Sequence, residues 1–148
     1  MDLRIEASAK EIAVKYGVLS LAEIVNWADN EIMSKEDPDP SFYDLSLART
    51  LGDALAILNA MGKSNNKAEV SKRSFSYFYK FMKLNKGYHQ KIAKALYDMA
   101  MEGIVPAKEA EGAMWSFWDS LDLAVDGIYG DPNQINQEMI EFIQKYMG

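Results

Sequence analysis

Cysteine is absent from the 148 residues, and histidine occurs once, as His89. The lack of cysteine excludes disulfide bonds, thiolate metal sites and a cysteine nucleophile, and it fits a reducing compartment. A single histidine excludes a metal site with two histidine ligands and any mechanism that needs two imidazoles. From this composition we expect neither a bound metal nor another cofactor.

Long apolar runs are missing as well. The longest stretch without a charged residue is Ala54–Gly62, whereas a membrane-spanning helix needs about 20 mostly apolar residues. The first six residues, from Met1 to Glu6, carry charges of both signs and lack the apolar core of a signal peptide. We therefore expect a cytoplasmic protein that does not contact a membrane.

Motifs that carry enzymatic chemistry are not found either. The sequence contains no Gly-x-Gly-x-x-Gly, no phosphate-binding Gly-x-x-x-x-Gly-Lys-Ser/Thr and no His-Glu-x-x-His. Nothing in the pattern ties His89 to a particular serine. Asp119 and Asp122 form an Asp-x-x-Asp pair that can bind magnesium or transfer protons, but this pair is common by chance in acidic helices. The sequence favours a protein that is not an enzyme, and a metal-dependent carboxylate hydrolase remains an alternative.

Helical segments make up nearly the whole sequence. Capping residues, glycines and prolines divide the chain, and the apolar residues between them recur at spacings of three and four. No segment alternates apolar and polar residues long enough to predict a strand. We expect an all-α bundle of about seven helices in a single domain over residues 1–148. The expected helices are 8–16, 20–36, 41–61, 67–84, 88–102, 106–129 and 132–146.

Apolar stripes predict the buried faces of several of these helices. In the helix that starts at Ser41, the stripe consists of leucines and one methionine: Leu47, Leu51, Leu55, Leu58 and Met61. In the helix that starts at Pro106, the stripe consists of Met114, Phe117, Leu121, Ala124, Val125 and Ile128.

The charged residues are segregated along the chain, whose 22 acidic and 16 basic residues give a net charge of −6. Residues 1–60 have a net charge of −6, residues 61–94 of +8, and residues 95–148 of −8. The acidic surface suits a basic partner and repels nucleic acid. The basic middle segment also holds many aromatic residues, so nucleic-acid binding through Lys72, Arg73, Lys80 and Lys83 is an alternative. We expect no direct contact with nucleic acid, because the same spacing is typical of a central helix with a solvated basic side.

The expected helix 106–129 has an acidic face that includes a tryptophan. Asp119, Asp122 and Asp126 lie on the side opposite to the apolar stripe, and Trp115 is one turn before Asp119. Tryptophan is enriched at binding hot spots, where it supplies apolar area beside a polar rim. These four residues predict a surface that binds a cationic protein. The alternative is that another helix covers Trp115 and the aspartates only keep the protein soluble.

A second candidate surface repeats this combination in the first third of the chain. Trp27 and Glu31 lie off the main apolar stripe of the expected helix 20–36. Asp37 and Asp39 follow in a loop that Pro38 and Pro40 hold extended. The alternative is an ordinary connection between helices.

One stretch of the chain contains the segment Val25-Asn26-Trp27-Ala28-Asp29-Asn30-Glu31-Ile32, followed by Asp37-Pro38-Asp39-Pro40 and Asp44-Leu45-Ser46-Leu47. This stretch is similar to a family of small bacterial proteins. Some members of that family are immunity proteins, which neutralise toxin domains used in contact-dependent growth inhibition between bacteria. The small, acidic, helical character of the chain also resembles these immunity proteins.

The resemblance implies an antitoxin that binds a cognate cationic toxin domain, such as a ribonuclease or tRNase, and that is a monomer or a weak homodimer. The two candidate surfaces, with Trp115 and Trp27 as anchors, would contact that toxin. A helical adaptor or regulatory protein for another basic partner is the alternative function.

Overall fold

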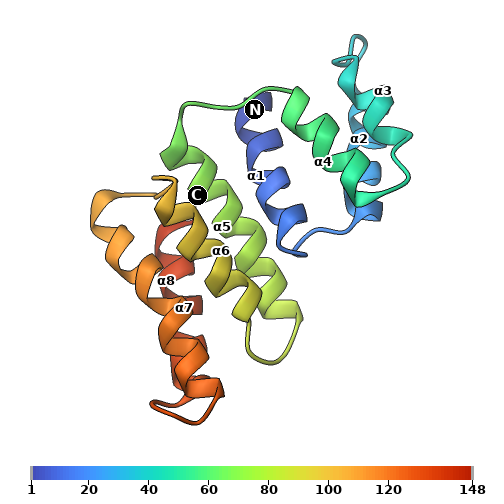
Figure 1. Ribbon diagram of the computed structural model, residues 1–148. Helices are drawn as coiled ribbons and strands as arrows, with labels where there is room; N and C mark the ends of the chain where they lie inside the picture. Colours follow the sequence, from blue (N-terminus) through green and yellow to red (C-terminus); the bar gives the residue numbers. More distant parts are fainter. Residues whose placement is uncertain (1, 148) are drawn as a thin grey trace. The chain divides into compact units, whose positions relative to one another are not determined.

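The computed structural model describes residues 2–147, and all its α-helices are labelled in Figure 1. The described part contains eight α-helices, seven of them at least seven residues long, one short 3₁₀ helix and no strand. The prediction of an all-α chain with about seven helices is therefore confirmed. The elements are α1 Leu3–Lys15, α2 Leu21–Ser34, α3 Ser41–Ser46, α4 Leu51–Ala60, α5 Lys67–Leu84, α6 Gln90–Met101, η1 Lys108–Ala110, α7 Glu111–Val125 and α8 Pro132–Tyr146.

The contacts between residues divide the chain into two compact units, one through Asn65 and one from Asn66 onward. The assignment of residues 1–148 to a single domain stays a prediction. In the part of the chain that the structure describes, no helix has both the length and the apolar character needed to cross a membrane.

In the N-terminal unit, α1 packs on α4 and α2 packs on α3 (Figure 1). Local chemistry fixes the helix starts, because side-chain oxygens accept hydrogen bonds from otherwise unpaired backbone N–H groups. Asp2 caps α1 in this way, and Ser20 and Glu23 form the predicted capping box at α2. Aliphatic and aromatic side chains from all four helices form the core: Ala7, Val14, Ile24, Ala28, Phe42, Leu45, Ala54 and Leu58.

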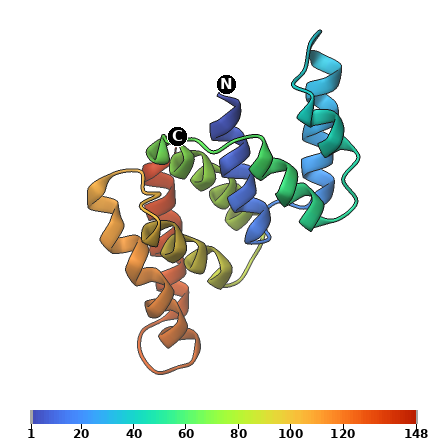
Figure 2. The same ribbon diagram turned by 45° about the horizontal axis from the view of Figure 1, so that its top comes forward.

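In the C-terminal unit, α7 packs on α6 and on α8, and α8 also packs on α5. The ribbon views show these helices in orange, yellow, red and green (Figure 1, Figure 2). The ring of Phe142 on α8 connects three helices, with centroid distances of 5.9 Å to Phe75 on α5 and 5.4 Å to Phe117 on α7. Leu121 of α7 and Met139 of α8 are fully buried. This packing places α7 and α8 in direct contact.

The predicted helix 41–61 is wrong, because the structure has two helices there. α3 ends at Ser46, and α4 begins at Leu51 after Thr50, whose hydroxyl accepts a hydrogen bond from the Asp53 N–H at 3.0 Å. Of the predicted stripe, Leu58 is buried as expected, but Leu47 is 77% exposed because it lies in the connection between the two helices. The first helix also begins at Leu3 rather than at Ser8.

The predicted helix 106–129 is too long at both ends, since α7 comprises only Glu111–Val125. Gly127 adopts a positive φ of 74°, and the next N–H, of Ile128, donates to the Leu123 carbonyl at 2.9 Å. This hydrogen bond across a left-handed glycine is the usual way in which a helix ends. Met114, Leu121 and Ala124 are buried as expected, but the predicted burial of Val125 and Ile128 is wrong.

Candidate protein-binding site

The acidic face of α7 is exposed over its C-terminal half. Asp119, Asp122 and Asp126, hereafter the α7 carboxylates, are all exposed. Among residues 2–147, no lysine or arginine forms an ion pair with any of the three. The wider segment 109–144 contains eight acidic residues and neither lysine nor arginine. This end of the C-terminal unit thus carries negative charge that the surrounding segment does not neutralise.

Trp115 is only partly exposed, because it packs between α7 and α6. Its ring meets Tyr97 of α6 edge to face at a centroid distance of 5.0 Å, and its indole N–H donates to the Glu111 carboxylate at 3.2 Å. The next tryptophan, Trp118, lies under the ammonium group of Lys94, 5.5 Å from the ring centroid. These contacts favour the alternative in which Trp115 helps to hold the fold, and they leave the α7 carboxylates as the exposed part of the predicted cluster.

The second predicted surface belongs to the N-terminal unit, and its two helical residues are engaged there. Trp27 is partly exposed; its ring meets Phe42 edge to face at 5.0 Å, and the Lys10 ammonium lies 4.5 Å from its centroid. Glu31 forms an ion pair with Lys35 one turn later.

The two aspartates of this second surface are in the connection between α2 and α3. Asp37 and Asp39 are exposed, and the Asp39 carboxylate accepts a hydrogen bond from the Ser41 N–H at 2.9 Å. Asp39 thus has a local role at the start of α3, which agrees with the interpretation of this loop as a connection.

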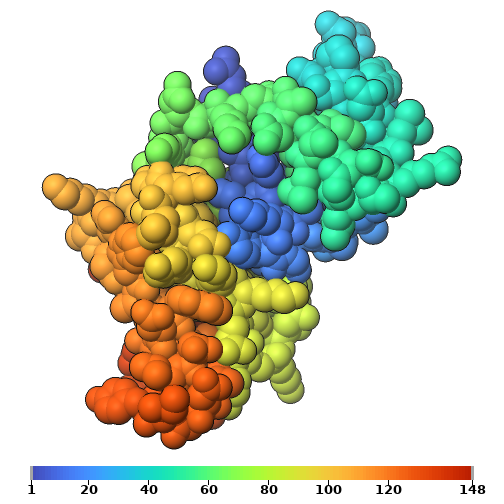
Figure 3. All heavy atoms as spheres, in the orientation of Figure 1, coloured from blue at the N-terminus to red at the C-terminus, as the bar shows by residue number. Residues whose placement is uncertain are grey.

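Exposed apolar residues follow the α7 carboxylates, and the sequence interpretation missed them. Ile128 is 70% exposed and Tyr129 is 79% exposed, in the loop between α7 and α8. Leu123 and Val125 are also exposed, and we call these four residues the apolar tip. In the space-filling view, the orange end of α7 and its loop lie at the surface of the C-terminal unit (Figure 3). Exposed apolar side chains next to charged ones make this end of α7 a candidate interaction site.

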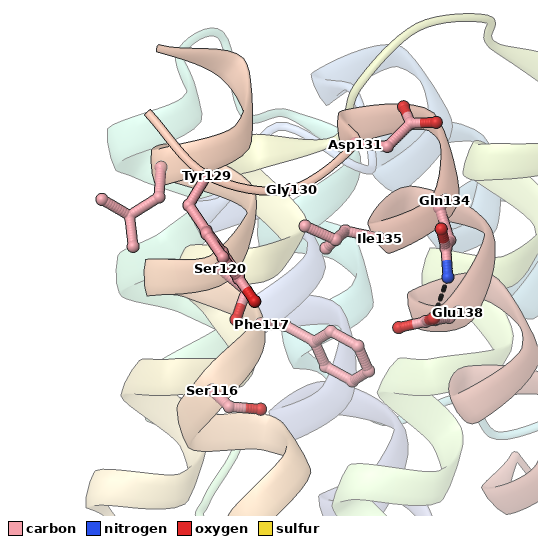
Figure 4. Close-up of a pocket in the computed structure, with 10 residues that line it drawn as sticks. Ser116, Phe117, Ser120, Tyr129, Gly130, Asp131, Gln134, Ile135 and Glu138 are labelled. Atoms are coloured by element: carbon pink, nitrogen blue, oxygen red, sulfur yellow. Dashed lines mark hydrogen bonds between the residues drawn. The ribbon is translucent and has the colours of Figure 1, made fainter. Parts of the chain in front are cut away.

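A hollow of about 300 Å³ opens between α7 and α8 next to the apolar tip. Figure 4 shows Phe117 and Ile135 pointing into the space between the two helices, with Gln134 and Glu138 on the α8 side. The Gln134 amide donates to the Glu138 carboxylate at 3.1 Å. The complete lining is Ser116, Phe117, Ser120, Leu123, Tyr129, Gly130, Asp131, Gln134, Ile135 and Glu138.

The loop at the mouth of the hollow is held in a defined conformation. Gly127 and Gly130 both have positive φ, and a Cβ atom at Gly130 would lie 3.2 Å from Cδ1 of Ile135. Asp131 caps α8 by accepting a hydrogen bond from the Asn133 N–H at 2.9 Å. Ile128 and Tyr129 are therefore presented by a short, anchored loop.

The chemistry of these groups is that of binding. Carboxylates attract cations, the apolar tip gains from exclusion of water, and the serines and the Gln134 amide offer hydrogen bonds at the edge of the hollow. Among the described residues, no group of three or more histidine, aspartate or glutamate side chains is placed to hold a metal ion.

No known family, no curated protein and no solved structure matches this chain.

Proposed function

We propose that this protein is an immunity protein that binds and neutralises a basic toxin domain, with the α7 carboxylates and the apolar tip as its contact surface. One observation carries the proposal. Three exposed carboxylates that form no ion pair on the described chain adjoin exposed Ile128 and Tyr129 at the end of α7. Such a combination provides an apolar centre with a charged rim, which is how specific interfaces are built.

The sign of the charge favours a nuclease as the toxin. An enzyme that binds a nucleic-acid backbone presents lysines and arginines to the phosphates. The segment 109–144, with eight acidic residues and no basic one, would be attracted to such a surface. Complementary charge raises association rates by roughly 10- to 1000-fold at low salt. Fast capture suits an inhibitor that must reach a toxin before the toxin reaches its substrate.

The resemblance of the sequence to immunity proteins also supports this function. It rests on residues 25–47, in the N-terminal unit, whereas the proposed contact surface lies in the C-terminal unit. The similar segments and the proposed contact surface thus consist of different residues, and the function is tested most directly with the toxin itself.

The test uses the product of the gene directly upstream as the candidate toxin, with association followed by stopped-flow fluorescence at low and high salt. In the variant Asp119→Lys/Asp122→Lys we expect association to slow by about tenfold or more at low salt and to lose most of its salt dependence. The two exposed side chains have no ion pairs on the described chain, so the melting temperature should change little. Growth of cells that express the toxin should be rescued by the wild-type protein and less well by the variant.

The control variant is Asp44→Lys/Glu102→Lys, which changes the net charge equally at exposed positions on α3 and after α6. We expect its association rate to stay close to that of the wild type. Equal slowing in both variants would mean that overall charge acts rather than the α7 carboxylates. Absence of any complex between the wild-type protein and the upstream product would refute the proposal.

A further inference from the structure

The hollow between α7 and α8 has a size and a lining that suit one apolar side chain with a cationic flank. Its volume of about 300 Å³ is at the lower end of the range for ligand pockets, roughly 300–1,000 Å³. Phe117, Ile135 and Leu123 supply apolar walls, while Asp131 and Glu138 place carboxylates at the α8 edge. An anionic small molecule is disfavoured there, because no basic residue lies between positions 109 and 144.

A segment with the complementary chemistry is present in this same chain. Leu84, the last residue of α5, is 74% exposed and lies between two exposed lysines, Lys83 and Lys86. Neither lysine forms an ion pair with a carboxylate of the described chain. The α5 end is well fixed, because the backbone N–H and side-chain amide of Asn85 both donate to the Phe81 carbonyl, at 3.0 and 2.9 Å.

We propose that the hollow is a self-association site that receives Leu84 and its flanking lysines from a second copy of this chain. The leucine side chain fills the space between Phe117 and Ile135. The ammonium groups of Lys83 and Lys86 approach the carboxylates at the edge of the hollow. The exposed Tyr129, at its mouth, covers part of the arriving helix end.

The turn after Leu84 is hydrogen-bonded to α8, the helix that forms one wall of the hollow. The Asn136 amide of α8 donates to the Gly87 carbonyl at 3.3 Å, and its oxygen accepts from the His89 N–H at 3.1 Å. These bonds tie the turn after Leu84 to α8, next to Ile135 in the sequence. In the dimer that we propose, each Leu84 enters the partner copy's hollow, so the two contacts are equivalent and the assembly is closed.

The dimer that we propose is weak and depends on salt. Its charged contacts lie at exposed positions, where ionic screening is effective. Sedimentation equilibrium of the wild-type chain over a range of concentrations should therefore give a monomer–dimer equilibrium whose Kd rises with sodium chloride. In Leu84→Ala we expect Kd to rise by about tenfold or more, because burial of each leucine side chain is lost.

The matched control is Leu47→Ala, since Leu47 is 77% exposed but lies in the N-terminal unit. Its Kd should equal that of the wild type. A second measurement locates the contact: the methyl NMR signal of Ile135 should shift with protein concentration in the wild type and in Leu47→Ala, and stay constant in Leu84→Ala.

Three results would overturn the inference: a monomer at every concentration, equal dimers in the wild type and Leu84→Ala, or an Ile135 signal that does not respond to dimer formation. Because no toxin is used, these outcomes leave the proposed function to its own test.

Discussion

The buried imidazole of His89 should make the stability of this protein depend on pH. His89 is the residue before α6, is 8% exposed, and lies edge to face against Phe81 at a centroid distance of 5.9 Å. Burial lowers the pKa of His89 below its ordinary value of 6.5, and a hydrogen bond with the Asn85 backbone opposes this shift in part. A positive charge at a helix N-terminus is also unfavourable. The folded protein therefore favours the neutral ring.

The direction of the effect follows from proton linkage. The unfolded chain binds a proton at His89 near pH 6.5, whereas the folded chain binds it only at lower pH. Between these two values the unfolded state holds more protons, so the free energy of unfolding decreases as the pH falls. For one proton the slope is at most about 1.4 kcal/mol per pH unit, and at pH 6.5 it is at most about half of that, because the unfolded chain is then only half protonated. Below the folded pKa the loss is complete and the slope returns to zero.

The assay is urea unfolding at a series of pH values from about 8 to 5, a window that lies above the ordinary pKa values of carboxylates. The matched variant is His89→Asn, because asparagine is a good helix N-cap and does not titrate. It loses the contact with Phe81, so its stability is lower overall, and the informative quantity is the slope with pH. We expect a flat profile for the variant. A variant profile as steep as that of the wild type would show that another group is responsible.

Two further predictions concern the end of the C-terminal unit. Trp115→Ala should lower the free energy of unfolding by about 2–3 kcal/mol, because it removes the edge-to-face contact with Tyr97. Trp115→Phe keeps a ring at this position and should cost less than half as much. Equal losses of the two variants in urea unfolding would contradict a packing role for the ring. Gly130→Ala should lower the free energy of unfolding by more than the roughly 1–2 kcal/mol expected for a left-handed alanine, because the new Cβ lies 3.2 Å from Cδ1 of Ile135. Gly127→Ala is the control, because a Cβ there has no neighbour within 4 Å. If melting curves give the same loss for both glycine variants, crowding against Ile135 is not significant.

The parts of the fold that the sequence predicts well are those determined by local chemistry. The Ser20–Glu23 capping box, the α5 bounds Lys67 and Leu84, and the start of α8 at Pro132 all agree with the structure. Each of these helix ends is determined by groups within one helical turn of each other, so the local sequence is enough to predict it. The split between α3 and α4 was not predicted, because the spacing of four between Leu47 and Leu51 continues the helical period across the break.

The residues of the candidate site also fall into two groups: those whose environment follows from their own helix and those whose environment depends on another helix. The exposure of the α7 carboxylates could be predicted, since charged residues at helical spacing opposite an apolar stripe face water. The environment of Trp115 depends on Tyr97, which lies on a different helix and 18 positions earlier. Periodicity along one helix contains no information about such a contact. By contrast, the sequence can predict the ion pair between Glu31 and Lys35, because these residues are four positions apart at the end of α2.

The apolar tip exists because one glycine ends α7 before its apolar stripe is complete. Ile128 follows Ala124 at the helical spacing of four, which predicts burial on the same face. Gly127 instead turns left-handed, and the N–H groups of Gly127 and Ile128 donate to the carbonyls of Ala124 and Leu123. Continuing the helix to bury Ile128 would only exchange these two hydrogen bonds for helical ones, and glycine is a poor helix former. Two large apolar side chains are thus exposed next to carboxylates that form no ion pair, and this exposure is the physical basis on which we propose an interface here.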